Sequence, residues 1–548
     1  MMRRKLKLGL WLDAMTVPAW AYAMLERLHG SPFAEIQVII CPVPAPCPRP
    51  RWQWRTLVYD MFHALDQRLW QMQPDAFAPR HLHMLLKELP LHEVRPVWRD
   101  GHWNLAAADL EAINPYDLDV LIDLGCGEPM EALDAAPTRY GVWRYRHGID
   151  HGVPGFWEVM RQQAVTYTQV ELHLGSGASK QVVFRSAAPT YPWSPARNRQ
   201  DVSWKSVAML PRELERLHRL GADVYFARIR EIPQEAGFDT PHRRGIPSNT
   251  MMLVLMIVYV ARLLGRLLQK LCTVEQWFLL YDVQPHVATS LHQFQTLRPP
   301  KDRLWADPHV VVQDGRYYLF FEELMHSKGR GHISLLILGP NGRLQGPPQI
   351  VLERHYHLSY PHLLTYGGKL YMIPETKQNH TIELYECVAF PDVWRHRMNL
   401  MEDVQAVDTT VLFYQGMWWL FTSLTEHEAA PAGDELFLFY ANDLFTTEWH
   451  PHPLNPIVSD VRKARPAGGI LQMEGGTKLY RPSQNSAVRY GHGWNLHEIV
   501  VLTENAYEEK TVRRVQPDWD RRLLGTHSFA YAAGLTVIDG LKRRLKLG

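Results

Sequence analysis

Pairs of apolar strands recur through the C-terminal half of the chain, and each pair is joined by a short turn that contains glycine. The turns lie at Asp314-Gly315, Gly367-Gly368, Gln415-Gly416 and Gly475-Gly476. An apolar strand, a glycine-containing turn and a returning apolar strand are typical of a β-hairpin. The copies begin at Trp305, Leu358, Ala406 and Ala464. Several strands per unit at a spacing of roughly 50 residues predict a β-propeller.

The N-terminal half has a different pattern, in which apolar strands alternate with helices. Strands are expected at 5–12, 36–40 and 119–124, and helices at 19–29 and 54–72. Such alternation predicts an open parallel sheet of Rossmann type. The glycines that follow the third strand, Gly125 and Gly127, lack the third glycine of a dinucleotide fingerprint. Two segments rich in Pro, Arg and Ser, 188–199 and 237–249, are expected to be linkers.

Residues 251–272 predict an amphipathic basic helix. Its uncharged part, Met251–Ala261, is shorter than the roughly 20 residues that a membrane-spanning helix needs. Arg262, Arg266 and Lys270 then recur every four residues, with leucines between them. The pattern fits either peripheral contact with a membrane surface or a connector helix packed between two domains. The basic C-terminal tail, 541–548, would reinforce a membrane contact.

Length and composition favour a multidomain protein, α/β followed by all-β. With 548 residues, we expect an α/β domain at 1–200, helices and linker at 201–272, and a five-bladed propeller at 273–548. The net charge is +2, and neither zinc-finger spacing nor a dense basic stripe occurs, so no nucleic-acid partner is expected. The 5 cysteines are scattered, which favours a reducing compartment. We therefore expect a cytoplasmic protein, peripheral at the inner face of the membrane if the helix binds there.

The α/β part resembles the N-terminal domain of formyltransferases of the methionyl-tRNA and sugar-nucleotide type. The resemblance covers roughly residues 5–190 and lies in the order of the segments 119–124, 140–148 and 152–160. That family uses an Asn and a His on the second of these segments and a later Asp. Here Arg144 and Arg146 occupy the strand positions. The resemblance therefore implies a scaffold without the formyl-transfer residues, whose arginines either bind an anion or lie on a solvated strand edge.

The propeller part resembles one family more specifically. The segments WADPHVVVQDGRYYLFFEE, HLSYPHLLTYGGKLYMIPET, VDTTVLFYQGMWWLFTS and KLYRPSQNSAVRYG follow in order within residues 275–530. They resemble the β-propeller domain found at the N-terminus of plant glucosamine inositolphosphorylceramide transferases and in bacterial proteins of surface-glycan loci. The resemblance implies the five-bladed fold of arabinanase- and xylosidase-type glycosidases, and a domain that acts on or recognises carbohydrate.

Glycoside chemistry needs one protonated and one ionised carboxyl across the scissile bond. The first and third blades carry Asp307 and Asp408 at their openings. The second opening has no acid, and Glu375 at the end of its next strand is the nearest candidate. We assign Asp307 as base or nucleophile, Glu375 as acid and Asp408 as a positioning carboxylate.

Further residues near the blade openings are candidates for binding substrate. Arg465 and Arg481 would clamp an anionic group such as a sugar phosphate or uronate. The remaining candidates are His309, Tyr360, His362, Gln484 and His527. The histidines lack the spacing of a metal motif, so neither a metal nor another cofactor is expected.

The favoured hypothesis is a carbohydrate-active enzyme that handles a glycosyl group in surface polysaccharide or glycolipid biosynthesis, by transfer or hydrolysis. Its partner would be a sugar, a sugar phosphate or a glycolipid. Two alternatives stay open. One is a non-catalytic glycan-binding scaffold, favoured by the missing second-blade acid, and the other is formyl or acyl transfer to an amino sugar.

Overall fold

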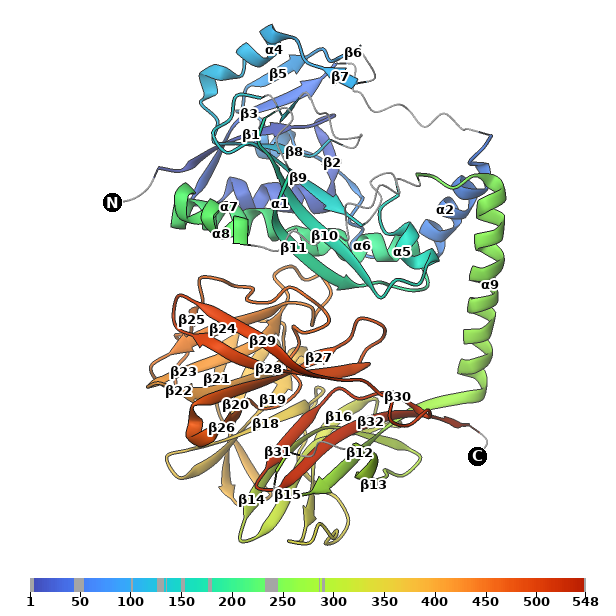
Figure 1. The fold of residues 1–548 in the computed structure, drawn as a ribbon, viewed down its shortest axis with the longest axis vertical. Coiled ribbons are helices and arrows are strands. Elements are labelled where there is room, and N and C mark those ends of the chain that lie inside the picture. Colours follow the sequence, from blue (N-terminus) through green and yellow to red (C-terminus); the bar gives the residue numbers. More distant parts are fainter. Residues whose placement is uncertain are drawn as a thin grey trace. The chain divides into compact units, whose positions relative to one another are not determined.

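The computed structural model describes residues 4–43, 54–99, 102–125, 133–134, 136–148, 153–175, 180–231, 245–284, 286–287 and 291–546 (Figure 1). The chain divides into two compact units. Unit 1 comprises residues 1–263 with 429–431, and unit 2 comprises residues 264–428 with 432–548. The expected tract at 237–249 falls largely outside the described residues.

Unit 1 is built on a seven-stranded sheet with the strand order β11-β10-β9-β8-β1-β3-β5. Pairing from β5 to β9 is parallel, whereas β9, β10 and β11 pair antiparallel, so the sheet is mixed rather than wholly parallel. The strands are β1 (Leu6–Trp11), β3 (Ala34–Pro42), β5 (Leu91–Val94), β8 (Val120–Asp123), β9 (Val142–His147), β10 (Val165–His173) and β11 (Gln181–Pro189). Two separate two-stranded sheets also occur in this unit. One pairs β2 (Thr16–Pro18) with β4 (Pro79–His81), and the other pairs β6 (Val97–Arg99) with β7 (His102–Asn104).

Helices accompany this sheet, and some of them bury apolar side chains against it. They are α1 (Ala19–His29), α2 (Leu57–Leu69), α3 (His83–Leu86), α4 (Ala107–Glu111), α5 (Phe156–Met160), α6 (Pro195–Ser206), α7 (Met209–Leu220) and α8 (Ala222–Glu231). The linker expected at 188–199 is wrong. The hydroxyl of Ser194 accepts a hydrogen bond from the Arg197 backbone N–H and caps α6, whose first residue is Pro195, so the same Ser and Pro that suggested a loop start a helix.

Unit 2 is a five-bladed propeller. Four blades are four-stranded sheets with the orders β14-β15-β16-β17, β18-β19-β20-β21, β22-β23-β24-β25 and β26-β27-β28-β29. The fifth blade joins the two ends of the unit, because β12 pairs antiparallel with β32 from Thr273↔Leu545 to Val283↔Leu535. This pairing closes the ring of blades and leaves no open edge between first and last.

The strand bounds follow the repeat seen in the sequence. They are β14 (Arg303–Gln313), β15 (Arg316–Met325), β16 (Arg330–Leu338), β17 (Gln349–Leu352), β18 (Ser359–Tyr366), β19 (Lys369–Thr376), β20 (Thr381–Ala389), β21 (Val393–Glu402), β22 (Ala406–Tyr414), β23 (Met417–Leu424), β24 (Leu436–Ala441), β25 (His450–Pro451), β26 (Leu471–Met473), β27 (Lys478–Asn485), β28 (Gly493–Leu502) and β29 (Tyr507–Val515). The closing blade has β12 (Thr273–Val283), β13 (Gln295–Leu297), β30 (Leu523–Gly525), β31 (Phe529–Ala532) and β32 (Leu535–Leu545).

The predicted hairpin turns are confirmed. Asp314 and Gly315 have φ of 49° and 71°, and Gln415 and Gly416 have φ of 51° and 81°. Two consecutive positive φ values are those of a type I′ turn, which matches the twist of the strands it joins. Apolar side chains pack between neighbouring blades, as Tyr371 and Leu384 of the second blade do with Trp418 of the third. The aromatic residues of the repeats therefore form much of the blade core.

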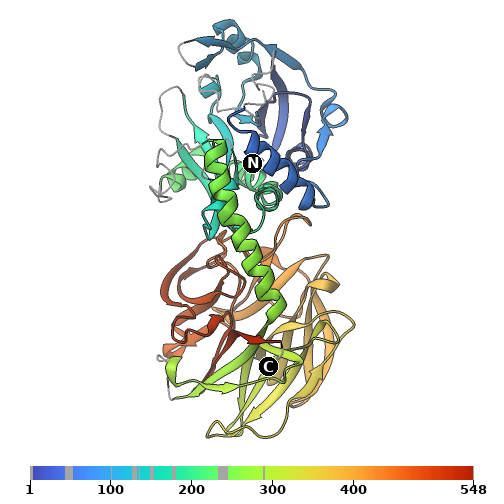
Figure 2. The same cartoon turned by 90° about the vertical axis from the view of Figure 1, so that its right-hand side faces the viewer.

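One helix connects the units in sequence. Helix α9 (Asn249–Cys272) runs without interruption and continues directly into β12 (Figure 2). This confirms the helix predicted at 251–272, and the division between the units falls within it.

Candidate active site at the openings of the propeller blades

The first strands of three blades share a β-bulge at the same position. The strand pairing shifts between Ala306 and His309, between Ser359 and His362, and between Val407 and Thr410. In each bulge the second residue has a positive φ, namely Asp307 (51°), Tyr360 (45°) and Asp408 (52°). A bulge takes its residue out of the strand ladder and re-aims its side chain. The repeat therefore presents one side chain per blade in equivalent positions, two of them carboxylates.

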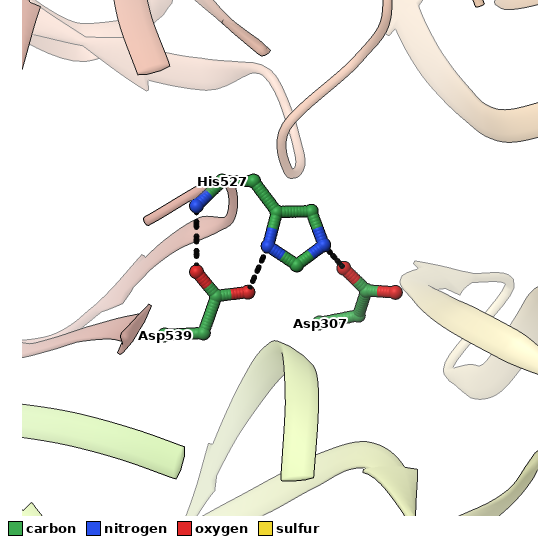
Figure 3. A group of neighbouring side chains, drawn as sticks. All are labelled: Asp307, His527 and Asp539. Atoms are coloured by element: carbon green, nitrogen blue, oxygen red, sulfur yellow. Dashed lines mark hydrogen bonds and ion pairs between the residues drawn. The ribbon is translucent and has the colours of Figure 1, made fainter. Parts of the chain in front are cut away.

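Asp307 is held by residues of the closing blade (Figure 3). Its Oδ1 accepts a hydrogen bond of 2.6 Å from the Ser528 hydroxyl and lies 3.2 Å from Nε2 of His527. On the other side of the ring, Nδ1 of His527 lies 2.6 Å from Oδ2 of Asp539. Burial would lower the pKa of His527, but Asp539 and then Asp307 raise it to about 10, so the imidazole is a cation between two carboxylates.

The charged His527 determines the state of Asp307. Burial by itself would raise the pKa of Asp307, but His527 and the Ser528 hydroxyl lower it below its usual range. Asp307 is therefore an ionised carboxylate with a buried counterion. It therefore meets one requirement of a base or nucleophile, which is to be ionised at neutral pH.

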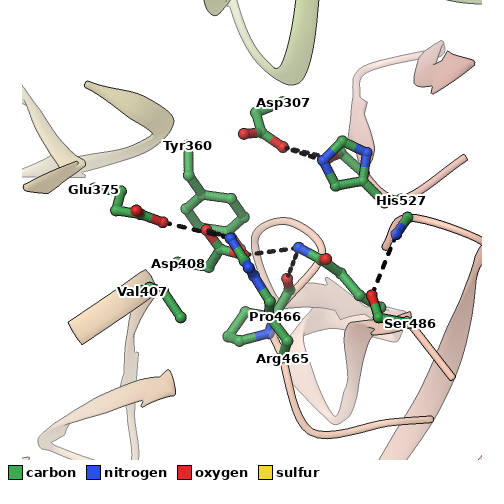
Figure 4. A network of polar contacts seen from close by, with 12 residues as sticks. Asp307, Tyr360, Glu375, Val407, Asp408, Arg465, Pro466, Ser486 and His527 are labelled. Atoms are coloured by element: carbon green, nitrogen blue, oxygen red, sulfur yellow. Dashed lines mark hydrogen bonds and ion pairs between the residues drawn. The ribbon is translucent and has the colours of Figure 1, made fainter. Parts of the chain in front are cut away.

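Asp408 and Glu375 meet at Arg465 (Figure 4). The guanidinium binds Asp408 through Nε, at 2.5 Å from Oδ2, and through Nη2, at 3.2 Å from Oδ1. Its Nη2 also lies 3.5 Å from Oε2 of Glu375. The amide of Gln484 donates to Asp408 Oδ2 at 2.7 Å and to the Pro466 carbonyl at 2.9 Å. Arg465 and Gln484 thus hold the Asp408 side chain in place beside Glu375.

The pKa of Glu375 is shifted in the opposite direction from that of Asp307. Burial, and after it the neighbouring Asp408 carboxylate, raise the pKa of Glu375 to about 8. Arg465 opposes this shift without cancelling it. At neutral pH Glu375 therefore keeps its proton, and its side chain remains 12% exposed. A protonated carboxyl with access to solvent can act as a general acid.

Tyr360 takes a supporting place. It is fully buried, its hydroxyl lies 2.8 Å from that of Thr410, and it accepts a hydrogen bond from the Gly468 backbone N–H at 2.8 Å. These bonds join the second, third and fourth blades. The structure brings Tyr360 into the network but leaves its hydroxyl engaged by protein groups.

His309 and His362 are the last residues of the first two bulges and come directly after Pro308 and Pro361. Both line a cavity of about 500 Å³. Most of the other lining residues are apolar, among them Leu363, Phe413 and Ile470. Burial, and then His362, lower the pKa of His309 to about 3, and burial lowers the pKa of His362 to about 4. Both rings are therefore neutral.

Arg481 is not brought to the site. Its guanidinium is ion-paired with Glu509, with Nε 2.8 Å from Oε2, and it donates to the Lys463 carbonyl at 2.9 Å. The side chain is 1% exposed. This arginine therefore connects strands inside the fourth blade, and it does not clamp an anion at the blade openings.

Glu322 is a residue to which the sequence had assigned no role. It pairs with Ala306 in the strand ladder, as Glu375 pairs with Ser359, so the two glutamates hold equivalent places in the first and second blades. Burial, and then the Asp307 carboxylate, raise the pKa of Glu322 well above its usual value. Its neighbour Glu323 is different, since Trp305, His332, Ser334 and Arg303 all bind its carboxylate.

His357, another histidine near the blade openings, faces Glu322. Its Nδ1 accepts a hydrogen bond of 2.8 Å from the Gly331 backbone N–H, so its proton is assigned to Nε2, which lies 3.4 Å from Oε1 of Glu322. A side chain at position 331 would collide, because a Cβ there would lie 2.6 Å from the Leu358 carbonyl oxygen and 2.8 Å from Glu322 Oε1. Gly331 therefore lets the two groups approach.

Asp307, His527 and Asp539 could also present metal ligands, since one atom from each lies within 4.8 Å of the others. A metal needs an unprotonated imidazole nitrogen. The raised pKa of His527 instead favours the ion-paired cation. With His527 protonated the three residues form a salt-bridged triad, and a metal would bind there only with loss of that proton.

The sequence of this region matches a known family. Residues 292–521 match the sequence model of the family described as glucosamine inositolphosphorylceramide transferase 1, N-terminal. Two relatives with the name glucosamine inositolphosphorylceramide transferase 1, from Oryza sativa subsp. japonica and Arabidopsis thaliana, are each 32% identical over 209 residues, or 38% of this chain. The match spans 28% of the rice protein and 27% of the Arabidopsis protein. The chain thus covers little more than a quarter of these relatives, and the resemblance stated for the propeller is confirmed for this segment.

Solved structures of glycoside hydrolases are more distantly similar. The family 117 enzyme Zg3597 of Zobellia galactanivorans has a TM-score of 0.31 and 11% identity, over 49% of this chain and 90% of that one. The catalytic domain of the GH62 α-L-arabinofuranosidase of Coprinopsis cinerea has a TM-score of 0.34 and 10% identity, over 48% and 97%. At these scores the likeness carries no argument, and the five-bladed fold rests on the strand pairing above.

Proposed function

We propose that the propeller is a carbohydrate-active enzyme that handles a glycosyl group at its blade openings. The observation that carries the proposal is the pairing of an ionised Asp307 with a protonated Glu375 on adjacent blades. Cleavage of a glycosidic bond needs one carboxyl in each state. Asp307 would take the proton of an attacking hydroxyl or attack the sugar carbon itself, and Glu375 would give its proton to the leaving oxygen.

Asp408 and Arg465 would set up the acid rather than react. Of the neighbouring charges, the Asp408 carboxylate has the largest effect on the pKa of Glu375, which it raises. Arg465 holds that carboxylate in place, and the Arg465 side chain itself is 16% exposed. Tyr490, 49% exposed, lies over the Arg465 guanidinium and beside His527, where an aromatic ring could stack on a sugar.

The substrate we infer is a sugar, a sugar phosphate or a glycolipid. The matched relatives are named for a transferase of glucosamine inositolphosphorylceramide, a name that combines an amino sugar, a phosphoinositol and a lipid. This name favours transfer over hydrolysis and assembly of a glycolipid or surface polysaccharide. We also propose a cytoplasmic site of action, which rests on the scattered cysteines of the sequence.

A non-catalytic glycan-binding scaffold is the second candidate. It is favoured by Tyr360, which occupies the bulge position of the second blade where its neighbours have Asp. Formyl or acyl transfer by unit 1 remains only a prediction from sequence. Arg144 and Arg146, at the positions expected for the reactive residues, are ion-paired with Asp123, Asp134 and Glu171 inside the sheet.

Two assays of the full-length protein test the proposal. Thermal shift would first screen nucleotide sugars, sugar phosphates and inositol phosphates, and turnover of those that bind would then be measured. Asp307→Asn and Glu375→Gln keep the shape of each side chain, so both should still bind, whereas turnover should fall by a factor of about 10² to 10⁴. Arg462→Ala, which removes an exposed arginine paired with Asp460, is the matched control and should behave like wild type.

The result separates the candidates. Binding that Arg465→Ala abolishes, without any turnover by the wild-type protein, would reject the enzyme and leave the scaffold. Turnover that survives both Asp307→Asn and Glu375→Gln would place the chemistry elsewhere.

A further inference from the structure

Helix α9 carries a continuous apolar stripe on its exposed side. The stripe consists of Leu253, Ile257, Val260, Leu264, Leu267 and Leu271, whose exposed fractions run from 44% to 70%. Successive members are alternately four and three residues apart, so they lie on one face of the helix. Large apolar side chains in such a row are uncommon on a protein surface and mark a contact.

The opposite face of α9 is already occupied in its first part. Met252 and Tyr259 are buried in an apolar cluster with Tyr59, Phe62 and Trp157 of unit 1. The Tyr259 hydroxyl donates to the Trp193 carbonyl, and Nη1 of Arg262 donates to the Val159 carbonyl at 3.3 Å. The helix is thus fixed by one face and presents the other.

Charge indicates what the exposed face contacts. Arg262, Arg266 and Lys270 continue the line of the packed face along the second half of the helix, and residues 249–272 contain no Asp or Glu. Just beyond the helix, the Lys546 backbone N–H donates to the Cys272 carbonyl at 3.0 Å, and Leu545 beside it is 64% exposed. The side of the helix away from the stripe is therefore basic in its second half, and residues 249–272 themselves carry no acid.

We propose that α9 lies in the surface of an anionic lipid bilayer, with the stripe buried among the acyl chains and Lys270, near the C-terminal end of the helix, at the headgroups. An apolar face on one side and Lys and Arg on the other is the pattern of a helix parallel to such an interface. A second copy of the chain fits less well, because two such helices would bring like charges together and residues 249–272 contain no Asp or Glu.

Crossing the bilayer also fits less well. The helix has 24 residues and a mean hydropathy of 2.0 in its most apolar window, which is sufficient for a span. A spanning α9 would, however, place Tyr259 and Arg262 within the acyl region and break their bonds to Trp193 and Val159. A helix lying in the interface keeps both.

The test is flotation of the purified full-length protein with preformed vesicles. We expect binding to phosphatidylcholine vesicles that contain phosphatidylglycerol, and about tenfold less binding to phosphatidylcholine alone. Leu264→Gln combined with Leu267→Gln should reduce binding to the anionic vesicles by about tenfold or more. Leu344→Gln combined with Val500→Gln changes two equally exposed apolar side chains of the propeller and should leave binding unchanged.

Three results would overturn the proposal. The first is a folded wild-type protein that binds neither kind of vesicle. The second is a change of solution mass in the Leu264 and Leu267 variant without a change in flotation, which would assign the stripe to a second copy. The third is bound protein that detergent releases but alkaline carbonate does not, which would indicate a span. None of these outcomes depends on the function proposed for the propeller.

Discussion

Two clusters of buried charge, one in each unit, are balanced differently. In the sheet of unit 1, Arg144 contacts Asp123 and Asp134 at 2.7 and 2.8 Å, and Arg146 lies 3.4 Å from Glu171. His173, between Asp134 and Glu171, has a raised pKa, because hydrogen bonds to these acids outweigh its burial. Each acid of this cluster therefore faces a cation, and the pKa of Glu171 falls to about 2.

At the blade openings the acids are in excess. The acidic side chains are Asp307, Glu322, Glu375, Asp408 and Asp539, and the cations that face them are Arg465 and His527. Glu322 and Glu375 consequently keep their protons. Balanced charges give a stable and inert cluster, whereas an excess of one sign leaves groups that can exchange protons near neutral pH. The difference separates a structural cluster from a reactive one without reference to any relative.

Arg465→Met should have the largest effect on stability. It leaves the Asp408 carboxylate buried beside other acids without its counterion, which should cost about 3 to 5 kcal/mol in the free energy of unfolding. Denaturant unfolding at pH 7 measures the loss. Adding Asp408→Asn to the variant removes the stranded charge and should recover most of that stability. A double variant as unstable as Arg465→Met alone would show that the arginine stabilises the protein by packing. It would contradict a stabilising role for the charge of Arg465 beside Asp408.

Glu171→Gln tests the balanced cluster in unit 1. The pKa of Glu171 is about 2 in the native state, since the His173 and Arg146 contacts outweigh the effect of burial, against an ordinary 4.5. The unfolded chain thus binds more protons between these values, and the stability from Glu171 is present above pH 4.5 and is lost as the pH falls toward 2. The variant should be less stable by about 3 kcal/mol at pH 7. Equal stability of variant and wild type at pH 7 would contradict the ion pairing.

Glu375→Gln should increase the free energy of unfolding, whereas Glu171→Gln decreases it. The pKa of Glu375 is about 8 in the native state, against an ordinary 4.5 in the unfolded chain. The native state then binds more protons between these values, so the stability of the wild type falls as the pH rises through them. The variant removes this slope and should be more stable by about 1 to 3 kcal/mol at pH 7. Unfolding curves from pH 5 to 8 measure the slope, and an unchanged slope would mean that Glu375 is ionised.

The sequence predicted the propeller well because its hairpins are local. A Gly-containing turn between two apolar strands determines strand direction without help from distant residues, and Asp314-Gly315 illustrates this. The openings of the repeats likewise located Asp307 and Asp408. Alternation of strands and helices predicted an α/β unit with a parallel sheet, but β9 and β10, which are separated by α5, pair antiparallel, and no local pattern encodes that pairing.

Partner choice was the part that could not be predicted. Arg465 and Arg481 look alike in the sequence, yet one binds Asp408 across blades and the other binds Glu509 within its own. The same holds for Glu322 and Glu323, which point to opposite faces of β15. Whether an ionisable residue reacts or stabilises is decided by distances between blades, which only the assembled propeller provides.

His357 offers the smallest effect and the sharpest check on the excess of acid. Its pKa is lowered by burial, so the native ring is neutral where the unfolded ring would be charged, and this residue costs stability as the pH falls below about 6.5. His357→Gln should remove that loss while costing about 1 kcal/mol at pH 8, because the hydrogen bond from the Gly331 N–H is weakened. The ring nitrogens can be observed directly by ¹⁵N NMR, which should show a neutral imidazole with its proton on Nε2 at pH 6.5. A doubly protonated ring there would mean that Glu322, 3.4 Å away, is an anion, and the propeller site would then hold one exchangeable acid instead of two.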